Sequence, residues 1–194
     1  MMIYDISQEV VSCNVFPGDP SPEAERMLSI QKGDMCNLTR ISMCAHNGTH
    51  VDAPYHFLDE GKTLEQISLD AFVGDCFVVH HEGDVTAKDA REILIQASAL
   101  HAQERILIGG KATVTAEAAK VFAEEGIKLI GNESQTVGPE NAPKEVHLIL
   151  LGAEVVLLEG LVLSHVPEGK YLLSAAPLNL AGADGAPCRA ILIE

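Results

Sequence analysis

Apolar residues along this chain gather in short runs, separated by turns that are rich in glycine, proline and charged residues. Runs of aliphatic and β-branched residues are typical of strands, because such side chains pack well on a pleated surface. They predict strands at residues 3–7, 37–44, 75–80, 105–108, 127–130, 154–159, 170–175 and 189–193. The runs are too short, and too often interrupted by charge, to cross a membrane.

Three segments carry the apolar spacing and the end signals of helices. Thr86 and Thr115 suit helix N-caps, and Asp89 adds a weak capping box to the first of them. Pro143 suits the first turn of the third helix, and a glycine follows the second and the third, where a helix stop belongs. The predicted helices follow Thr86 through Leu100, follow Thr115 through about Glu125, and cover residues 144–151.

Strand and helix alternate over residues 75–130, which predicts two βαβ-like units and part of a parallel sheet. Residues 12–23 hold three prolines and are expected to form a loop. Residues 58–70 are predicted to be a surface connection that could act as a lid. Residues 131–143 follow a strand, at the edge where α/β folds often bind ligands. The expected fold is α/β, with residues 1–194 as a single domain.

Composition narrows the class of protein. At 194 residues and 47% hydrophobic, the chain can bury a sizeable core. Its formal net charge of −15 argues against a nucleic-acid partner, because phosphate binding needs a basic face. The five cysteines show no CxxC spacing and are odd in number, which suits reduced thiols in the cytoplasm. The N-terminus has no signal-peptide pattern, and no membrane association is expected.

The candidate chemistry gathers in the stretch HNGTHVDAPYHF at residues 46–57. In an extended segment, His46, His50, Asp52 and His56 point to one face, and all four are ligand types for divalent ions. Four residues of straight strand span about 13 Å, so two of these histidines can share an ion only if the chain bends, most easily at Gly48. A helix is the weaker alternative because the stretch contains glycine, β-branched residues and proline.

Other polar positions carry weaker signals. His147 in the short third helix and Glu159 at a strand end are possible ligands, but each taken alone is more often a structural or solvated residue. Four further histidines are interpreted as structural or solvent-facing: His80, His81, His101 and His165. The GGK at 109–111 lacks the spacing of a phosphate-binding loop.

HNGTHVDAPYHF matches, position for position, the pattern HxGTHxDxPxHF of the metal-dependent cyclase/hydrolase family, which includes bacterial kynurenine formamidases and isatin hydrolases. The resemblance extends to the opening DIS, the FPGD loop, a His and Glu twelve residues apart, and the closing PLNLAGADGAPCRAIL. It implies a domain with a mixed, barrel-like sheet and flanking helices, often described as swivelling β/β/α. Such proteins usually form homodimers or homotetramers with the site near a subunit interface.

The resemblance also implies roles for individual residues. The metal ligands it implies are His46, His50, Asp52, His147 and Glu159. His56 matches the family's catalytic histidine, which would carry protons between water and the leaving group. The implied cofactor is one or two divalent ions per subunit, with Zn²⁺ preferred and Mn²⁺ as the alternative.

The function implied is that of an arylformamidase, which converts N-formylkynurenine to kynurenine and formate in tryptophan catabolism. Phe16 and Phe57 are the candidate substrate-binding residues. Many kynurenine formamidases carry a His-His pair where this chain has Val146 followed by His147, and their DTxSxDP-like loop is replaced here by GNESQTVGP. These departures keep two alternatives open: an isatin-type cyclic amide or lactone hydrolase or cyclase of the same family, and a metal-binding protein without turnover.

Overall fold

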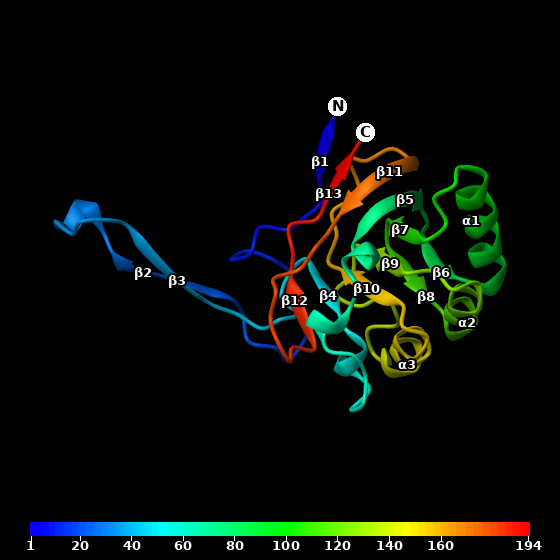
Figure 1. The fold of residues 1–194 in the computed structure, drawn as a ribbon, viewed down its shortest axis with the longest axis horizontal. Helices are drawn as coiled ribbons and strands as arrows, with labels where there is room; N and C mark the ends of the chain where they lie inside the picture. The colour runs from blue at the N-terminus through cyan, green and yellow to red at the C-terminus, as the bar shows by residue number, and fades with distance from the viewer.

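A nine-stranded mixed sheet forms the body of the protein, and the computed structural model describes all residues 1–194 (Figure 1). Strands β5, β7, β9 and β10 are parallel neighbours at its centre, and the strands on both sides of them pair antiparallel. In sheet order the strands are β1 (Ile3–Asp5), β13 (Ile191–Ile193), β11 (Gly169–Ser174), β5 (Val73–His80), β7 (Arg105–Gly109), β9 (Leu129–Asn132), β10 (Val156–Glu159), β4 (His50–Asp52) and β12 (Gly185–Pro187).

Three α-helices cover one face of the sheet (Figure 1). They are α1 (Ala87–Ala99), α2 (Ala116–Glu125) and α3 (Lys144–Gly152). Four short 3₁₀ helices lie in connections, namely η1 (Ile30–Lys32), η2 (Pro54–His56), η3 (Leu64–Gln66) and η4 (Leu69–Ala71). Two small sheets pair β2 (Glu23–Leu28) with β3 (Leu38–Ser42) and β6 (Gly83–Val85) with β8 (Ala112–Val114). No helix is both long and apolar enough to cross a membrane.

The predicted α/β class is confirmed, and each predicted strand and helix is present within a few residues of its expected bounds. The capping box at Thr86 and Asp89 forms, and Gly126 ends α2 with a positive φ. Three kinds of strand escaped prediction because no apolar alternation marks them. β2 divides evenly between charged and apolar residues without regular alternation, β6 and β8 have only three residues each, and β12 contains glycine and proline.

Two apolar clusters lie on opposite faces of the sheet. One packs the helices on the central strands, with Phe122 and Leu150 among its largest side chains. The other fills the inner face of the curled sheet and includes Ile6, Val51 and Phe72. The central strands are therefore buried on both faces, which explains why they read as continuous apolar runs in the sequence. Such packing holds the ends of β4 and β10 rigidly beside each other.

The extended conformation expected over residues 46–56 holds only for β4. Residues 46–49 form a turn, and His56 lies in η2, where Pro54 occupies a first-turn position that suits proline. The predicted bend at Gly48 is present, with a φ of 65°. Its amide donates to the carbonyl of Asn14. A Cβ at this position would stand 2.9 Å from Cys13 Cβ, so glycine is required by both conformation and space.

Residues 58–70 connect β4 to β5 and pack on the body of the protein. Leu64 is buried, and its amide donates to the carbonyl of Ala183. The amide of Tyr55 donates to the carbonyl of Lys62 and closes the base of the connection. The connection is thus anchored at its middle and its base, and these contacts give no support to the lid that the sequence suggested.

Gly48→Ala is expected to lower the free energy of unfolding by ~2–4 kcal/mol, because it combines left-handed strain with overlap at Cys13. The matched control is Gly126→Ala, with a φ of 72° and no atom near the new Cβ. It carries the conformational cost alone, roughly 1 kcal/mol. Urea unfolding of both variants measures the difference, and equal losses would contradict the crowding at Cys13.

Candidate metal centre

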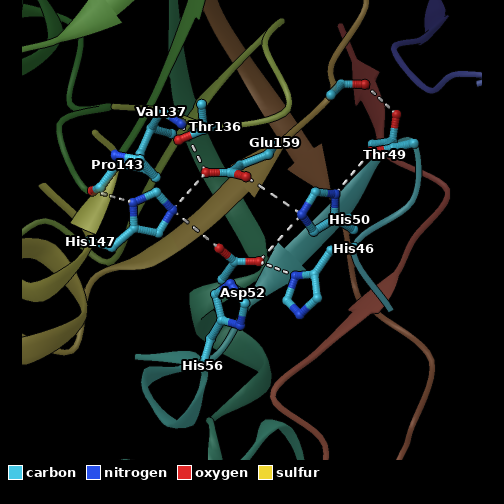
Figure 2. Close-up of polar contacts among 12 residues, drawn as sticks. His46, Thr49, His50, Asp52, His56, Thr136, Val137, Pro143, His147 and Glu159 are labelled. Carbon is cyan, nitrogen blue, oxygen red and sulfur yellow. Dashed lines mark hydrogen bonds and ion pairs between the residues drawn. The ribbon is translucent and has the colours of Figure 1, made fainter. Parts of the chain in front are cut away.

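The pairing of β4 with β10 brings the two distant parts of the site together. The strands are antiparallel, and their register places Glu159 opposite His50 and Leu157 opposite Asp52. His50 and Asp52 are two residues apart in β4, so their side chains share a face. The third helix, α3, adds His147 from the other side of the same space (Figure 2). The fold thus brings His50 and Asp52 into contact with His147 and Glu159, which lie roughly a hundred residues further along the chain.

Four of these side chains form a closely packed group around two carboxylates (Figure 2). His50 Nε2 lies 3.3 Å from Asp52 Oδ1 and 3.5 Å from Glu159 Oε2. His147 Nε2 lies 3.3 Å from Glu159 Oε1 and 3.7 Å from Asp52 Oδ2. All four are buried. Asp52 therefore faces both histidines, one with each oxygen.

Backbone oxygens hold the outer nitrogen of both buried histidines. His50 Nδ1 lies 2.9 Å from the carbonyl oxygen of Gly48, and His147 Nδ1 lies 2.9 Å from that of Pro143. In each ring Nδ1–H donates to the carbonyl, so Nε2 is left to face the carboxylates. This arrangement is typical of histidines that bind metal ions through the inner nitrogen.

The residues between His46 and His50 form the turn. Asn47 accepts a hydrogen bond from the amide of Cys44 through its side-chain oxygen. Thr49 Oγ1 donates to the carbonyl of Gly160, at 2.6 Å, and accepts from the amide of Gln8. Because Gly160 directly follows Glu159, the threonine ties the motif to the end of β10. These residues therefore have structural reasons for their identity.

His46 lies beside this group and faces two carboxylates. Its Nδ1 is 2.8 Å from Asp52 Oδ1, and its Nε2 is 2.8 Å from Asp184 Oδ2. The ring of His56 stacks on that of His46, with centroids 4.0 Å apart, and its Nδ1 is 3.2 Å from the same Asp184 oxygen. Sequence reasoning missed Asp184. Its only signal was a place in the closing GADGAP segment, which was read as support for the resemblance alone.

The local electrostatics favour protonated histidines in the protein without an ion. Burial by itself lowers the pKa of His50, but the carboxylates of Asp52 and Glu159 outweigh it and raise that pKa to about 10. Facing carboxylates likewise outweigh burial at His46 and His147, and the pKa of each is raised. Burial would raise the pKa of Asp52, yet the facing histidines hold it well below its usual range.

His56 differs from the other histidines of the site, whereas Asp184 follows the pattern of Asp52. Burial lowers the pKa of His56 below its usual value, and the carboxylates near it compensate only in part. Burial raises the pKa of Asp184, but the hydrogen bond to His46 outweighs it, and the net pKa is lowered. His56 is thus the histidine of the site that is most readily neutral at physiological pH.

The donors fit a divalent metal ion. Two carboxylates, Asp52 and Glu159, are buried among histidines, and the amide of Val137 also donates to Glu159 Oε1 at 2.8 Å. No lysine or arginine pairs with either carboxylate, and uncompensated buried charge is costly. Two groups of potential ligand atoms can be drawn, and both contain Asp52. They are His46, Asp52 and His56, and His50, Asp52 and Glu159. Nitrogen and oxygen donors in these numbers suit Zn²⁺ and similar ions.

A cavity of about 300 Å³ opens onto this group. Its apolar wall contains Phe16, Phe57 and Pro143, and Phe57 also packs its ring 4.6 Å from that of His147. The polar lining residues are Asp19, Cys44, His46, His50, His56, Gln135, Thr136, His147 and Glu159. The size suits a small molecule with a single ring. No residue of the 58–70 connection lines the cavity. The position of this connection therefore gives no support to its predicted role as a lid.

The structure thus brings all five predicted ligand residues and His56 into one site, and both predicted aromatic residues line its cavity. Tyr55 is exposed and does not line it. Away from the site, Nε2–H of His80 donates to the carbonyl of Val166, and Nε2–H of His81 donates to the carbonyl of Asp84. The structural interpretation of that pair agrees with these contacts.

Comparisons with known proteins agree with the geometry. The family described as "Putative cyclase" matches residues 4–139. The kynurenine formamidase of Erythrobacter litoralis (strain HTCC2594) is 34% identical over 206 aligned residues, which cover 99% of this chain and 94% of that protein.

Solved structures superpose over nearly the whole chain. One described as a potential metal-dependent hydrolase with cyclase activity has a TM-score of 0.80 at 30% identity, covering 98% of this chain and 96% of its own. Isatin hydrolase A from Labrenzia aggregata, solved with benzyl benzoate, has a TM-score of 0.80 at 22% identity, with coverages of 98% and 93%, and shares the fold. The family match spans most of the sequence and the relatives are full-length, so the chain belongs to the cyclase family.

Proposed function

We propose that this protein is a metal-dependent hydrolase of small aryl formamides, with N-formylkynurenine as the substrate and kynurenine and formate as products. The observation that carries the proposal is the buried group of His50, Asp52, His147 and Glu159 at the base of a small cavity with an aromatic wall. The similarity to a kynurenine formamidase over the full chain supports this substrate over a cyclic amide.

The ligands of the proposed metal site are His46, His50, Asp52, His147 and Glu159. Asp52 faces three histidines and is the residue best placed to contact two ions, so we propose one or two ions per subunit. Zn²⁺ is the preferred ion because nitrogen and oxygen donors dominate the set, and Mn²⁺ is the alternative. When bound, the ion supplies Lewis acidity toward a carbonyl oxygen and lowers the pKa of water.

His56 is the proposed proton carrier. Its Nε2 makes no hydrogen bond to protein, and burial keeps its pKa low enough for a neutral ring. Nε2 can take a proton from the water that adds to the formyl carbon, and can return it to the nitrogen as the carbon–nitrogen bond breaks. Phe16 and Phe57 form the apolar wall against which the aryl group packs.

We also propose that the chain works as a homodimer or homotetramer through the hairpin of β2 and β3, which projects from the body as an arm (Figure 1). Every residue of both strands is exposed, and a lone two-stranded hairpin has marginal stability in water. Apolar side chains gather toward the tip of the arm, where Ile30 is 59% and Met35 is 97% exposed. Exposed apolar surface of this kind marks association sites.

The protein is proposed to act in the cytoplasm on a small-molecule amide. Its five cysteines carry free thiols, which suit a reducing compartment. One of them, Cys44, lines the cavity, and a thiol there would be open to oxidation outside such a compartment.

The first test uses His56→Ala and His50→Ala with N-formylkynurenine, formanilide and isatin as substrates. His56→Ala is expected to keep its zinc and lose ~10²–10⁴-fold in kcat, because only proton transfer is removed. His50→Ala is expected to lose zinc and turnover together. Zinc per chain is measured by elemental analysis. Loss of zinc from His56→Ala would make His56 a ligand, and a wild type that opens isatin but leaves formamides intact would refute the substrate.

Zinc binding to the metal-free protein is expected to release protons, since its ligand histidines must become neutral. The pKa of His50 is raised to about 10, so this ring is protonated near neutrality and affinity should rise tenfold per pH unit for each proton released, from about pH 7 to 9. Calorimetry in buffers of different ionisation enthalpy counts the protons. His101→Asn, far from the cavity, should behave as wild type. A flat affinity across this range would remove His50 from the ligand set.

The assembly is tested by light scattering of purified protein. Ile30→Asp with Met35→Asp should shift the mass toward the monomer, because charge at the tip of the arm opposes apolar packing. Ile95→Asp, at an equally exposed apolar position on α1, is the matched control and should leave the mass unchanged. A wild type that is monomeric at micromolar concentration would refute the proposal.

A further inference from the structure

Asp184 occupies a position between two functional histidines of different proposed roles. It lies in the loop between β11 and β12, and its side chain is 43% exposed. A single oxygen, Oδ2, is 2.8 Å from His46 Nε2 and 3.2 Å from His56 Nδ1. The two rings stack on each other, so one carboxylate contacts the edges of both.

The contact with His46 completes a pattern that the two buried histidines already show. In His50 and His147 an oxygen of the backbone holds the nitrogen that faces away from the carboxylates. In His46 the corresponding outer nitrogen is Nε2, and the oxygen that faces it belongs to Asp184. A carboxylate in this position fixes the orientation of the ring and increases the basicity of the nitrogen that faces Asp52.

The contact with His56 selects which nitrogen can move a proton. Nδ1–H donates to Asp184, and Nε2 therefore carries the lone pair and makes no hydrogen bond to protein. Rotation of the ring would break this hydrogen bond. The same carboxylate stabilises the ring when it holds a second proton during the reaction.

The backbone around Asp184 is built to hold the carboxylate in place. The carbonyl of Asp184 accepts from the amide of Ala53 at 2.8 Å. Glu65 accepts from the amide of Gly182, at 2.9 Å. A Cβ at Gly185 would lie 2.6 Å from Val51 O and 2.7 Å from His46 Cε1, so only glycine lets the chain pass this close to the ring.

We propose that Asp184 is a positioning residue that orients both the ligand histidine His46 and the proton carrier His56, and thereby couples metal binding to proton transfer. The proposal rests on the proposed function for its kinetic half and on the geometry alone for its metal half. Its two halves make separate predictions, since one concerns the affinity for an ion and the other concerns turnover with the ion bound.

The metal half is tested with Zn²⁺ alone, by competition against a chromophoric chelator. Asp184→Ala is expected to weaken zinc binding by ~10–100-fold, the usual effect of removing an outer partner of a ligand histidine. Asp184→Asn, which keeps an acceptor oxygen without the charge, should fall between wild type and Asp184→Ala. Wild-type affinity in Asp184→Ala would overturn this half, whether or not the protein hydrolyses any formamide.

The kinetic half is tested at saturating Zn²⁺ with N-formylkynurenine. Asp184→Ala is expected to lower kcat at least tenfold with KM within about twofold of wild type, because orientation of His56 matters to proton transfer and little to substrate binding. Asp184→Glu should restore part of the lost kcat, since the exposed loop has room for a longer carboxylate. An unchanged kcat in Asp184→Ala, beside an active wild type, would overturn this half.

Glu65→Gln is the control for a merely structural role. It weakens the support of the same loop at Gly182 but leaves the Asp184 carboxylate in place. Zinc affinity and kcat in Glu65→Gln should stay within about twofold of wild type. If Glu65→Gln reproduces the losses of Asp184→Ala, the order of the loop is responsible and the positioning role is overturned. A wild type that binds zinc but hydrolyses no formamide refutes the proposed function and leaves the zinc test decisive.

Discussion

Two buried carboxylates, Asp52 and Glu159, set the requirement that the rest of the site satisfies. Each lies in a sheet strand, and the antiparallel register of β4 and β10 fixes how far apart they are. No lysine or arginine faces them, and apart from the amide of Val137, which donates to Glu159, the groups that face them are histidines. A bound cation would compensate the remaining charge. The rigid strands, packed on both faces, hold the two acids together in spite of their repulsion.

The site divides into a buried part and a partly exposed part. His50 and His147 have their outer nitrogens held by the backbone, which makes their orientation a property of the fold itself. His46 and His56 instead depend on Asp184, a side chain at the open side of the site. Groups that hold an ion benefit from rigidity, whereas a proton carrier must reach both water and substrate. The proposed ligands His50 and His147 lie in the buried part, and the proposed proton carrier His56 lies in the open part, beside the proposed ligand His46.

The arm formed by β2 and β3 is connected to the cavity through both of its ends. Phe16 and Asp19 precede the arm and Cys44 follows it, and all three line the cavity. A partner that packs against the arm would therefore contact a segment that is continuous with one wall of the cavity. The arm also explains why a chain with two apolar clusters still exposes Met35 and Ile30 to solvent.

Local sequence determined most elements and half of the site in this protein. Periodicity and caps predicted α1, α2, α3 and the apolar strands, because those signals depend on neighbouring residues only. The phase of the motif and its glycine predicted the bend between His46 and His50. The conformation beyond β4 was not predictable, since Pro54 starts η2 and moves His56 off the strand.

Only the tertiary structure decided which distant residues complete the site. His147 and Glu159 gave weak local signals, and the resemblance to the family was needed to select them. Asp184 gave no signal beyond its place in the closing GADGAP segment, because a carboxylate in a glycine-rich loop looks solvated until β12 pairs with β4 and brings it against two histidines. Likewise β2 is half charged and half apolar and lacks regular alternation, so the sequence did not reveal the arm. Strand register and loop contacts join residues far apart in the chain, and no local pattern records them.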